Sequence, residues 1–185
     1  MGKRKYTRSF EIALSAISCA VAVVFLLLGF WSGVLLATGY LLGIIALMLP
    51  LSKQFYLGGF LAYLGTVILA IVMGAAWQFW RLVPFIMFFG LHPLINSFQL
   101  RLNINKWLAL FIKAVWFDLT LWASYYLIFG GILGGEYADS SFYEFLNNYI
   151  LLFIFVGGTL IFWPYDYLIF KCQIGVNKLV YRIKK

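Results

Sequence analysis

Long apolar runs separated by short polar segments make up most of the chain. No charged residue lies between Ile12 and Ser52, a stretch of 41 residues, or between Gln54 and Trp80. One membrane crossing takes about 20 residues of helix, so the first stretch is long enough for two crossings. Trp31-Ser32-Gly33 is the natural turn between them, because Gly and Ser permit a tight bend and Trp favours the membrane interface. The pattern therefore predicts a series of membrane-spanning helices.

Six spans account for the whole pattern. We expect them at about residues 8–30, 33–49, 54–80, 83–100, 106–129 and 149–172, followed by a basic cytoplasmic tail at 173–185. Pro50 should close the second helix, Pro84 suits the first turn of the fourth, and the His92-Pro93 pair should kink that fourth helix. The predicted fold class is all-α, a polytopic integral membrane protein of about six transmembrane helices in a single transmembrane domain, residues 1–185.

Composition leads to the same class. The chain is 64% hydrophobic and only 11% charged, with a mean hydropathy of +0.96. A soluble domain carries roughly 25% charged residues, so lipid is expected to be the main solvent. A net charge of +8 would also fit a nucleic-acid-binding protein. However, the basic residues lie between the apolar runs, and we therefore expect contact with anionic lipid and no nucleic acid.

The basic residues also orient the predicted helices. Six spans place both termini on one side, and an inside N-terminus puts 12 of the 14 basic residues at the cytoplasmic face. These are Lys3, Arg4, Lys5, Arg8, Lys53, Arg101, Lys106, Lys171, Lys178, Arg182, Lys184 and Lys185. Three acidic residues, Glu136, Asp139 and Glu144, then fall outside. By the positive-inside rule, we predict a multi-pass plasma-membrane protein with both termini in the cytoplasm.

Two polar groups are expected near the bilayer midplane. Asp118 lies about twelve residues into the fifth predicted helix, and His92 lies at comparable depth in the fourth. An ionised carboxylate there costs a few kcal/mol or more unless it is paired, so Asp118 should face the interior, with His92 or Lys113 as its partner. Such a group is either a substrate or proton site or a buried polar pair that fixes helix packing. For Asp166, near the inner end of the sixth helix, we expect an ion pair between helices.

Aromatic side chains surround Asp118 along the fifth helix. Trp122, Tyr125 and Tyr126 lie between it and the outer end of the span. A cavity lined by them would suit a flat ring compound, with Arg81 or Asp118 fixing its polar atoms. Aromatic packing is the alternative interpretation.

Motifs for enzymes and metal sites are absent from the sequence. There is no Gly-x-Ser-x-Gly, no His-Glu-x-x-His and no phosphate-binding Gly-x-x-x-x-Gly-Lys-Ser/Thr loop, and the chain has one histidine. Cys19 and Cys172 have no metal-ligand spacing. We expect neither an enzyme nor a bound metal or cofactor, so energised transport would need a partner.

Two short motifs carry a family resemblance. Ala16 and Ala20 form a small-xxx-small motif on the first helix, and Pro164-Tyr165-Asp166 begins a final basic helix that runs through Lys171 to Tyr181-Arg182. With the six-span layout, the chain resembles the substrate-binding S components of energy-coupling factor transporters. The resemblance implies a vitamin- or metal-binding subunit. It would dock through Ala16 and Ala20 onto a transmembrane coupling subunit driven by two ATPases.

The resemblance also implies an outward-opening cavity for a small-molecule ligand. Its lining would include Arg81, Trp122, Tyr125, Tyr126, Asn147 and Asn148, to which the intramembrane polar residues His92 and Asp118 are added as candidates. The short turn at Trp31-Ser32-Gly33 departs from the family, which often has a longer gating loop there. A structural scaffold of a cell-envelope complex, such as the MreD-type partner in cell-wall elongation, is the alternative function. An intramembrane enzyme or independent carrier is a third, without catalytic motifs or a visible inverted repeat.

Overall fold

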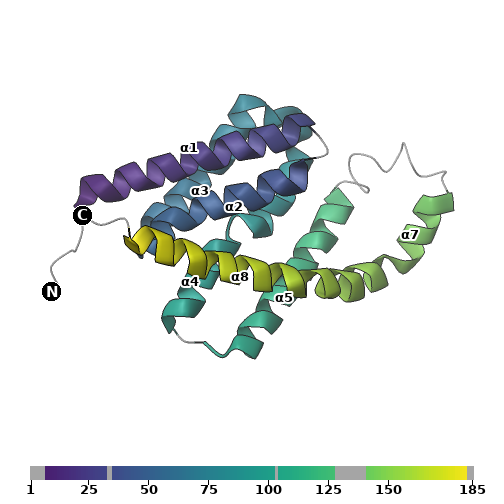
Figure 1. The fold of residues 1–185 in the computed structure, drawn as a ribbon. Helices are drawn as coiled ribbons and strands as arrows, with labels where there is room; N and C mark the ends of the chain where they lie inside the picture. The colour runs from purple at the N-terminus through teal and green to yellow at the C-terminus, as the bar shows by residue number, and fades with distance from the viewer. Residues whose placement is uncertain (1–6, 33–34, 103, 128–140, 183–185) are drawn as a thin grey trace. The chain divides into compact units, whose positions relative to one another are not determined.

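The computed structural model describes residues 7–32, 35–102, 104–127 and 141–182, and those residues form helices and no β-strand (Figure 1). Five helical stretches are long and apolar enough to cross a membrane: Arg8–Ser32, Tyr56–Gly74, Phe79–Leu102, Lys106–Tyr125 and Asn148–Val180. A sixth apolar helix, Leu36–Ser52, has 17 residues. It is about 26 Å long, slightly shorter than the roughly 30 Å hydrocarbon core. The all-α prediction is confirmed, and the helices fit a membrane protein.

The chain divides into two compact units. The first comprises Met1–Asn103 and Ile169–Lys185, and the second comprises Ile104–Leu168. The first contains α1 (Arg8–Ser32), α2 (Leu36–Ser52), α3 (Tyr56–Ala70), the π-helical turn η1 (Ile71–Ala75), the 3-10 helix η2 (Ala76–Leu82), the π-helical turn η3 (Phe85–Phe89) and α4 (His92–Leu102). The second contains α5 (Lys106–Tyr125), α7 (Ser141–Leu152) and the π-helical turn η5 (Phe153–Gly158). Helix α8 (Thr159–Arg182) begins in the second unit and ends in the first.

Helices α1 and α2 form a close hairpin. A Cβ atom at Gly39 would lie 2.7 Å from the Phe25 carbonyl oxygen and 3.0 Å from the Gly29 Cα. These backbones approach closely because both positions lack a side chain. At the turn, the Ser32 hydroxyl oxygen accepts a hydrogen bond from the Leu35 N–H at 3.2 Å. Helix α1 thus ends at Ser32 and α2 begins at Leu36, while Gly33 of the predicted turn lies outside the described residues.

Pro50 does not close α2, which continues to Ser52. A proline has no N–H, so it leaves the carbonyl oxygen four residues earlier without its helical donor. That oxygen belongs to Ala46, and the Ser18 hydroxyl of α1 donates to it at 2.7 Å. A hydroxyl from a neighbouring helix is one way in which proline is tolerated inside membrane helices. The hydrogen bond from α1 therefore explains why α2 continues beyond Pro50, where the sequence predicted its end.

The segment expected as one helix over 54–80 is interrupted. Helix α3 ends at Ala70, and the following turn contains Gly74 at φ 136°. Only glycine adopts that backbone conformation without strain. A 3-10 helix then leads to Leu82. The absence of charged residues does not report this break, because the charge-free run from Gln54 to Trp80 continues across it.

Tyrosine hydroxyls satisfy the irregular backbone that follows. The Gly90 N–H donates to the Phe85 carbonyl at 2.8 Å, a spacing of five residues, so the Ile86 carbonyl loses its usual helical donor. The Tyr63 hydroxyl donates to that carbonyl at 2.8 Å. Further back, the Tyr40 hydroxyl donates to the Arg81 carbonyl. Such backbone is tolerated at membrane depth where protein groups replace the missing hydrogen bonds.

The interruption expected at His92-Pro93 lies just before this pair. Gly90 and Leu91 form a turn, and α4 begins at His92. Pro93 therefore sits in the first turn of α4, where a missing N–H costs nothing.

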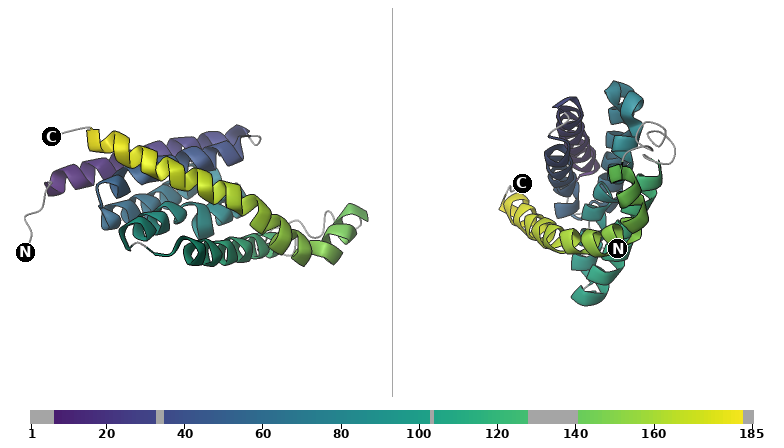
Figure 2. Two further views of the ribbon diagram at one scale, coloured as in Figure 1. Left: turned by 60° about the horizontal axis from the view of Figure 1, so that its bottom comes forward. Right: turned by 90° about the vertical axis from the view of Figure 1, so that its right-hand side faces the viewer.

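Several helix ends meet at one end of the first unit. Arg8 of α1 and Leu57 of α3 border one cavity. Tyr56 of α3, Arg101 of α4 and Lys178 of α8 border another. The beginning of α1 and the last turns of α8 thus lie at the same end of this unit (Figure 2).

Candidate functional site

Asp118 is buried inside the second unit with one oxygen poorly satisfied. Its side chain is 4% exposed. The Oδ2 atom accepts a hydrogen bond from the Thr159 hydroxyl at 2.9 Å, but that hydroxyl also lies 2.7 Å from the Phe155 carbonyl, so a single proton serves two acceptors. The Oδ1 atom has no hydrogen-bond partner among the described residues. Buried polar atoms without partners are rare and call for an explanation.

Gly158 lies directly against this carboxylate. A Cβ atom there would be 2.6 Å from the Asp118 Oδ1 and 3.1 Å from the Leu121 Cδ1. The adjacent Gly157 has open space, with nothing within 4 Å of a Cβ. Sequence analysis missed Gly158 and Thr159 as neighbours of Asp118. The only available signal was the Gly157-Gly158-Thr159 run inside an apolar span.

The predicted aromatic residues cluster beyond Asp118, near the end of α5. Trp122 and Tyr126 meet edge to face with ring centroids 5.0 Å apart, and Tyr125 and Tyr126 do so at 5.6 Å. Trp122 is 42% exposed and Tyr126 is 49% exposed. The rings therefore contact one another and present a partly open aromatic surface. Of the two asparagines predicted nearby, Asn148 is exposed on α7, and the side chain of Asn147 lies outside the described residues.

Lys113 forms the ion pair expected between helices. Its Nζ lies 2.5 Å from the Asp166 Oδ1, and both side chains are buried. On the same two helices, the rings of Phe117, Phe162 and Tyr165 pack against one another, with centroids 5.2 to 6.4 Å apart. The prediction of an ion pair is confirmed. Lys113, considered as a partner for Asp118, is engaged with Asp166 instead.

Arg81 and His92 belong to the first unit. Arg81 lies in η2 with its side chain partly exposed. His92 is fully buried and stacks on Phe88, with centroids 4.9 Å apart. His92 lies at the start of α4, whereas Asp118 belongs to the second unit.

Ala16 and Ala20 are both exposed on α1, as is Ala13. The buried face of α1 begins with Ser18 and continues through Ala22 and Leu26. Beside Ala16 lies a cavity of about 490 Å³ between α1 and the first turns of α3. No other described helix of the first unit covers the surface formed by Ala13, Ala16 and Ala20.

The candidate site in the second unit combines a buried carboxylate, a glycine that lies against it and a cluster of aromatic rings. In the described part of the chain, no group of three His, Cys, Asp or Glu residues is placed to hold a metal ion. No protein-family model, curated protein or solved structure matches the chain.

Proposed function

We propose that this protein is the membrane-embedded substrate-binding subunit of a small-molecule, vitamin-like importer energised by partner ATPases. The observation that carries the proposal is the open surface of α1 at Ala16 and Ala20. In lipid, small residues on an exposed face let another helix approach closely, and the adjacent cavity of about 490 Å³ widens that surface. This is the arrangement expected of a helix that docks onto a transmembrane coupling subunit.

Asp118 and the aromatic surface beyond it support the ligand-binding half of the proposal. A buried carboxylate oxygen without a partner among the described residues can accept a hydrogen bond from a ligand. Trp122 and Tyr126 offer ring faces for a flat compound. A thermal-shift screen of vitamins with the detergent-purified protein tests this half. We expect one planar compound to raise the melting temperature, and Asp118→Asn to weaken its affinity about tenfold or more.

Docking is tested separately from binding. Ala16→Trp and Ala20→Trp should abolish uptake and co-purification of ATPases, because a bulky ring prevents close helix approach, while ligand binding stays intact. Leu28→Trp is the matched control: Leu28 is 51% exposed on the same helix, roughly 18 Å from Ala16 along the axis. If Leu28→Trp impairs uptake equally, α1 has no specific docking surface.

The scaffold alternative makes the opposite prediction. A structural partner in a cell-envelope complex would co-purify with that complex, and no vitamin would change its melting temperature. That combined result would replace the importer proposal.

A further inference from the structure

A second cavity in the first unit has a basic lining. It lies where α2 and α4 end and α3 begins, between those ends and the last turns of α8, with a volume of about 550 Å³. Sites for small ligands measure about 300–1,000 Å³. Arg101 and Lys178 contribute two positive charges, and none of the residues that line the cavity is acidic. The cavity is therefore suited to an anion.

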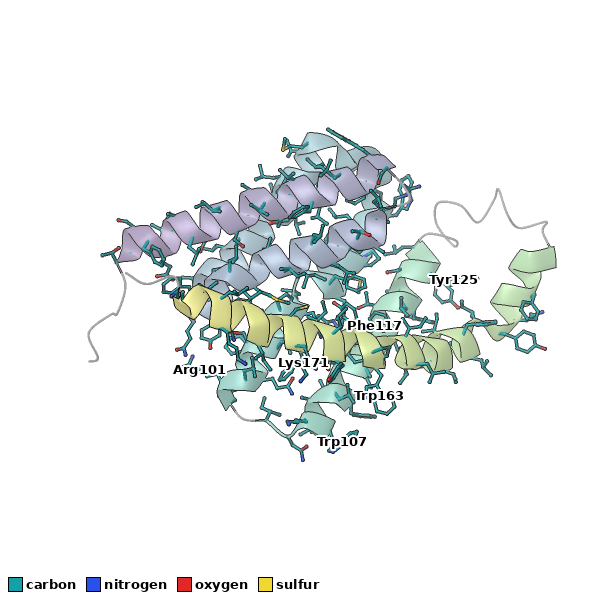
Figure 3. The ribbon with its side chains drawn as sticks, viewed as in Figure 1. Arg101, Trp107, Phe117, Tyr125, Trp163 and Lys171 are labelled. Carbon is teal, nitrogen blue, oxygen red and sulfur yellow. The ribbon has the colours of Figure 1, made fainter. Side chains whose placement is uncertain are left out.

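Arg101 is held in position at this cavity. Its guanidinium carbon lies 5.2 Å from the centre of the Tyr56 ring, within range of a cation–π interaction. Tyr56 in turn stacks on Phe98, with centroids 4.7 Å apart. Figure 3 shows Arg101 extending from α4 beside the C-terminal turns of α8. A guanidinium fixed by an aromatic ring presents its remaining N–H groups in a defined direction.

Neutral donors line the same space. The Oδ1 of Asn177 accepts from the Gln173 Nε2 at 3.3 Å, which leaves the Asn177 amide nitrogen as the donor for the cavity. The buried Ser97 contributes a hydroxyl group. Phosphate oxygens accept hydrogen bonds and bind arginine with matching geometry. Two cations with amide and hydroxyl donors are thus the groups that recognise a phosphate.

We propose that this cavity binds the phosphate of an anionic lipid headgroup. Leu51, Leu100 and Ile174 form an apolar wall beside the basic groups, which suits a ligand whose phosphate is joined to acyl chains. The helix ends around it carry the basic residues that the positive-inside rule assigns to the cytoplasmic face. Basic pockets between membrane helices on that face bind such headgroups. The site is separate from Asp118 and does not depend on the importer proposal.

Native mass spectrometry of the full-length protein in neutral detergent tests the assignment. With phosphatidylglycerol and phosphatidylcholine at equal concentration, we expect preferential retention of phosphatidylglycerol. Lys178→Gln and Arg101→Gln should each lower that retention about tenfold, the effect of one charge-assisted hydrogen bond. Lys178 is exposed, so its replacement should not disturb folding. Arg8→Gln removes the same charge at an exposed position outside this cavity and should leave retention unchanged.

A second arm separates a lipid from a soluble phosphate. Melting temperatures are compared in inorganic phosphate and in chloride at equal ionic strength. Stabilisation by inorganic phosphate without preference for phosphatidylglycerol would overturn the lipid assignment in favour of a soluble phosphate ester. Equal loss of lipid in Arg8→Gln would overturn the site altogether, because retention would then follow net charge.

Discussion

The two buried charged residues of α5 have different surroundings. Lys113 lies 2.5 Å from a carboxylate oxygen of Asp166, whereas Asp118 receives a share of one hydroxyl proton from Thr159. A buried charge is tolerated when it is paired and becomes costly when its partner is removed. At the residue scale, the ion pair gives Lys113 a structural role, whereas Asp118 is the residue that we propose for ligand binding.

Removing Lys113 should destabilise the protein strongly. Lys113→Met removes the cation that lies 2.5 Å from the buried Asp166 carboxylate, and we expect the free energy of unfolding in detergent to fall by about 3–5 kcal/mol. Replacing both residues, Lys113→Met with Asp166→Leu, should recover most of that loss. A double variant as unstable as the single one would contradict the structural role of the pair.

Gly158 offers a sharper test at the same scale. Gly158→Ala places a methyl group against the Asp118 Oδ1 and the Leu121 side chain. Overpacking of this kind costs about 1–3 kcal/mol, measured as a lower melting temperature. Gly157→Ala is the matched control, since nothing lies within 4 Å of its Cβ, and it should leave stability nearly unchanged. Equal effects of both changes would indicate a loss of backbone freedom rather than contact with the carboxylate.

At the element scale, the helices are shaped by groups on their neighbours. Pro50 remains helical beside Ser18 of α1, and the π-helical turn before α4 depends on the hydroxyl of Tyr63 on α3. Both are long-range contacts that replace a local backbone hydrogen bond. Irregular helices inside a membrane need such replacements, because lipid offers no donors or acceptors.

The coupling between Ser18 and Pro50 can be measured by a double-mutant cycle. Ser18→Ala should cost about 1 kcal/mol of unfolding free energy, because the Ala46 carbonyl loses its donor. In the background of Pro50→Ala, a backbone N–H again serves that carbonyl, and the cost of Ser18→Ala should fall to a few tenths of a kcal/mol. Additive effects of the two substitutions would show that Ser18 acts elsewhere.

At the scale of the whole molecule, charge asymmetry and the meeting of helix ends agree. The described start of α1 and end of α8 lie at the same end of the first unit. Arg8, Arg101 and Lys178 all lie there too. An even number of crossings would place both ends on one side of the membrane, and by the positive-inside rule we predict that this side is the cytoplasm.

Reporter fusions test that orientation. Alkaline phosphatase, which is active only outside the cytoplasm, should be inactive when fused after Lys185 or inserted beside Lys53. Inserted between Glu136 and Asp139, it should be active, because that acidic segment is predicted to be outside. Activity at Lys185 would contradict the shared cytoplasmic side of the termini.

The sequence by itself determined the all-helical fold class and the location of most of the long apolar helices. The distribution of apolar and charged residues is a local property of each segment, so these helices can be predicted along the chain without knowledge of their contacts. An interhelical ion pair for Asp166 was also predicted, because a buried charge in lipid needs a partner, but the sequence left open whether Lys113 pairs with Asp118 or with Asp166.

Only the tertiary structure decided where helices break and what Asp118 contacts. The Ser18 hydroxyl donates a hydrogen bond to the carbonyl of Ala46, 28 residues away, and Asp118 accepts one from the hydroxyl of Thr159, 41 residues away. No local sequence pattern predicts such contacts, because they depend on how each helix is rotated about its axis and shifted along it relative to its neighbour. Gly158 is the clearest case. The sequence does not distinguish it from the adjacent Gly157, and only the packing of η5 on α5 places Gly158 against the Asp118 carboxylate.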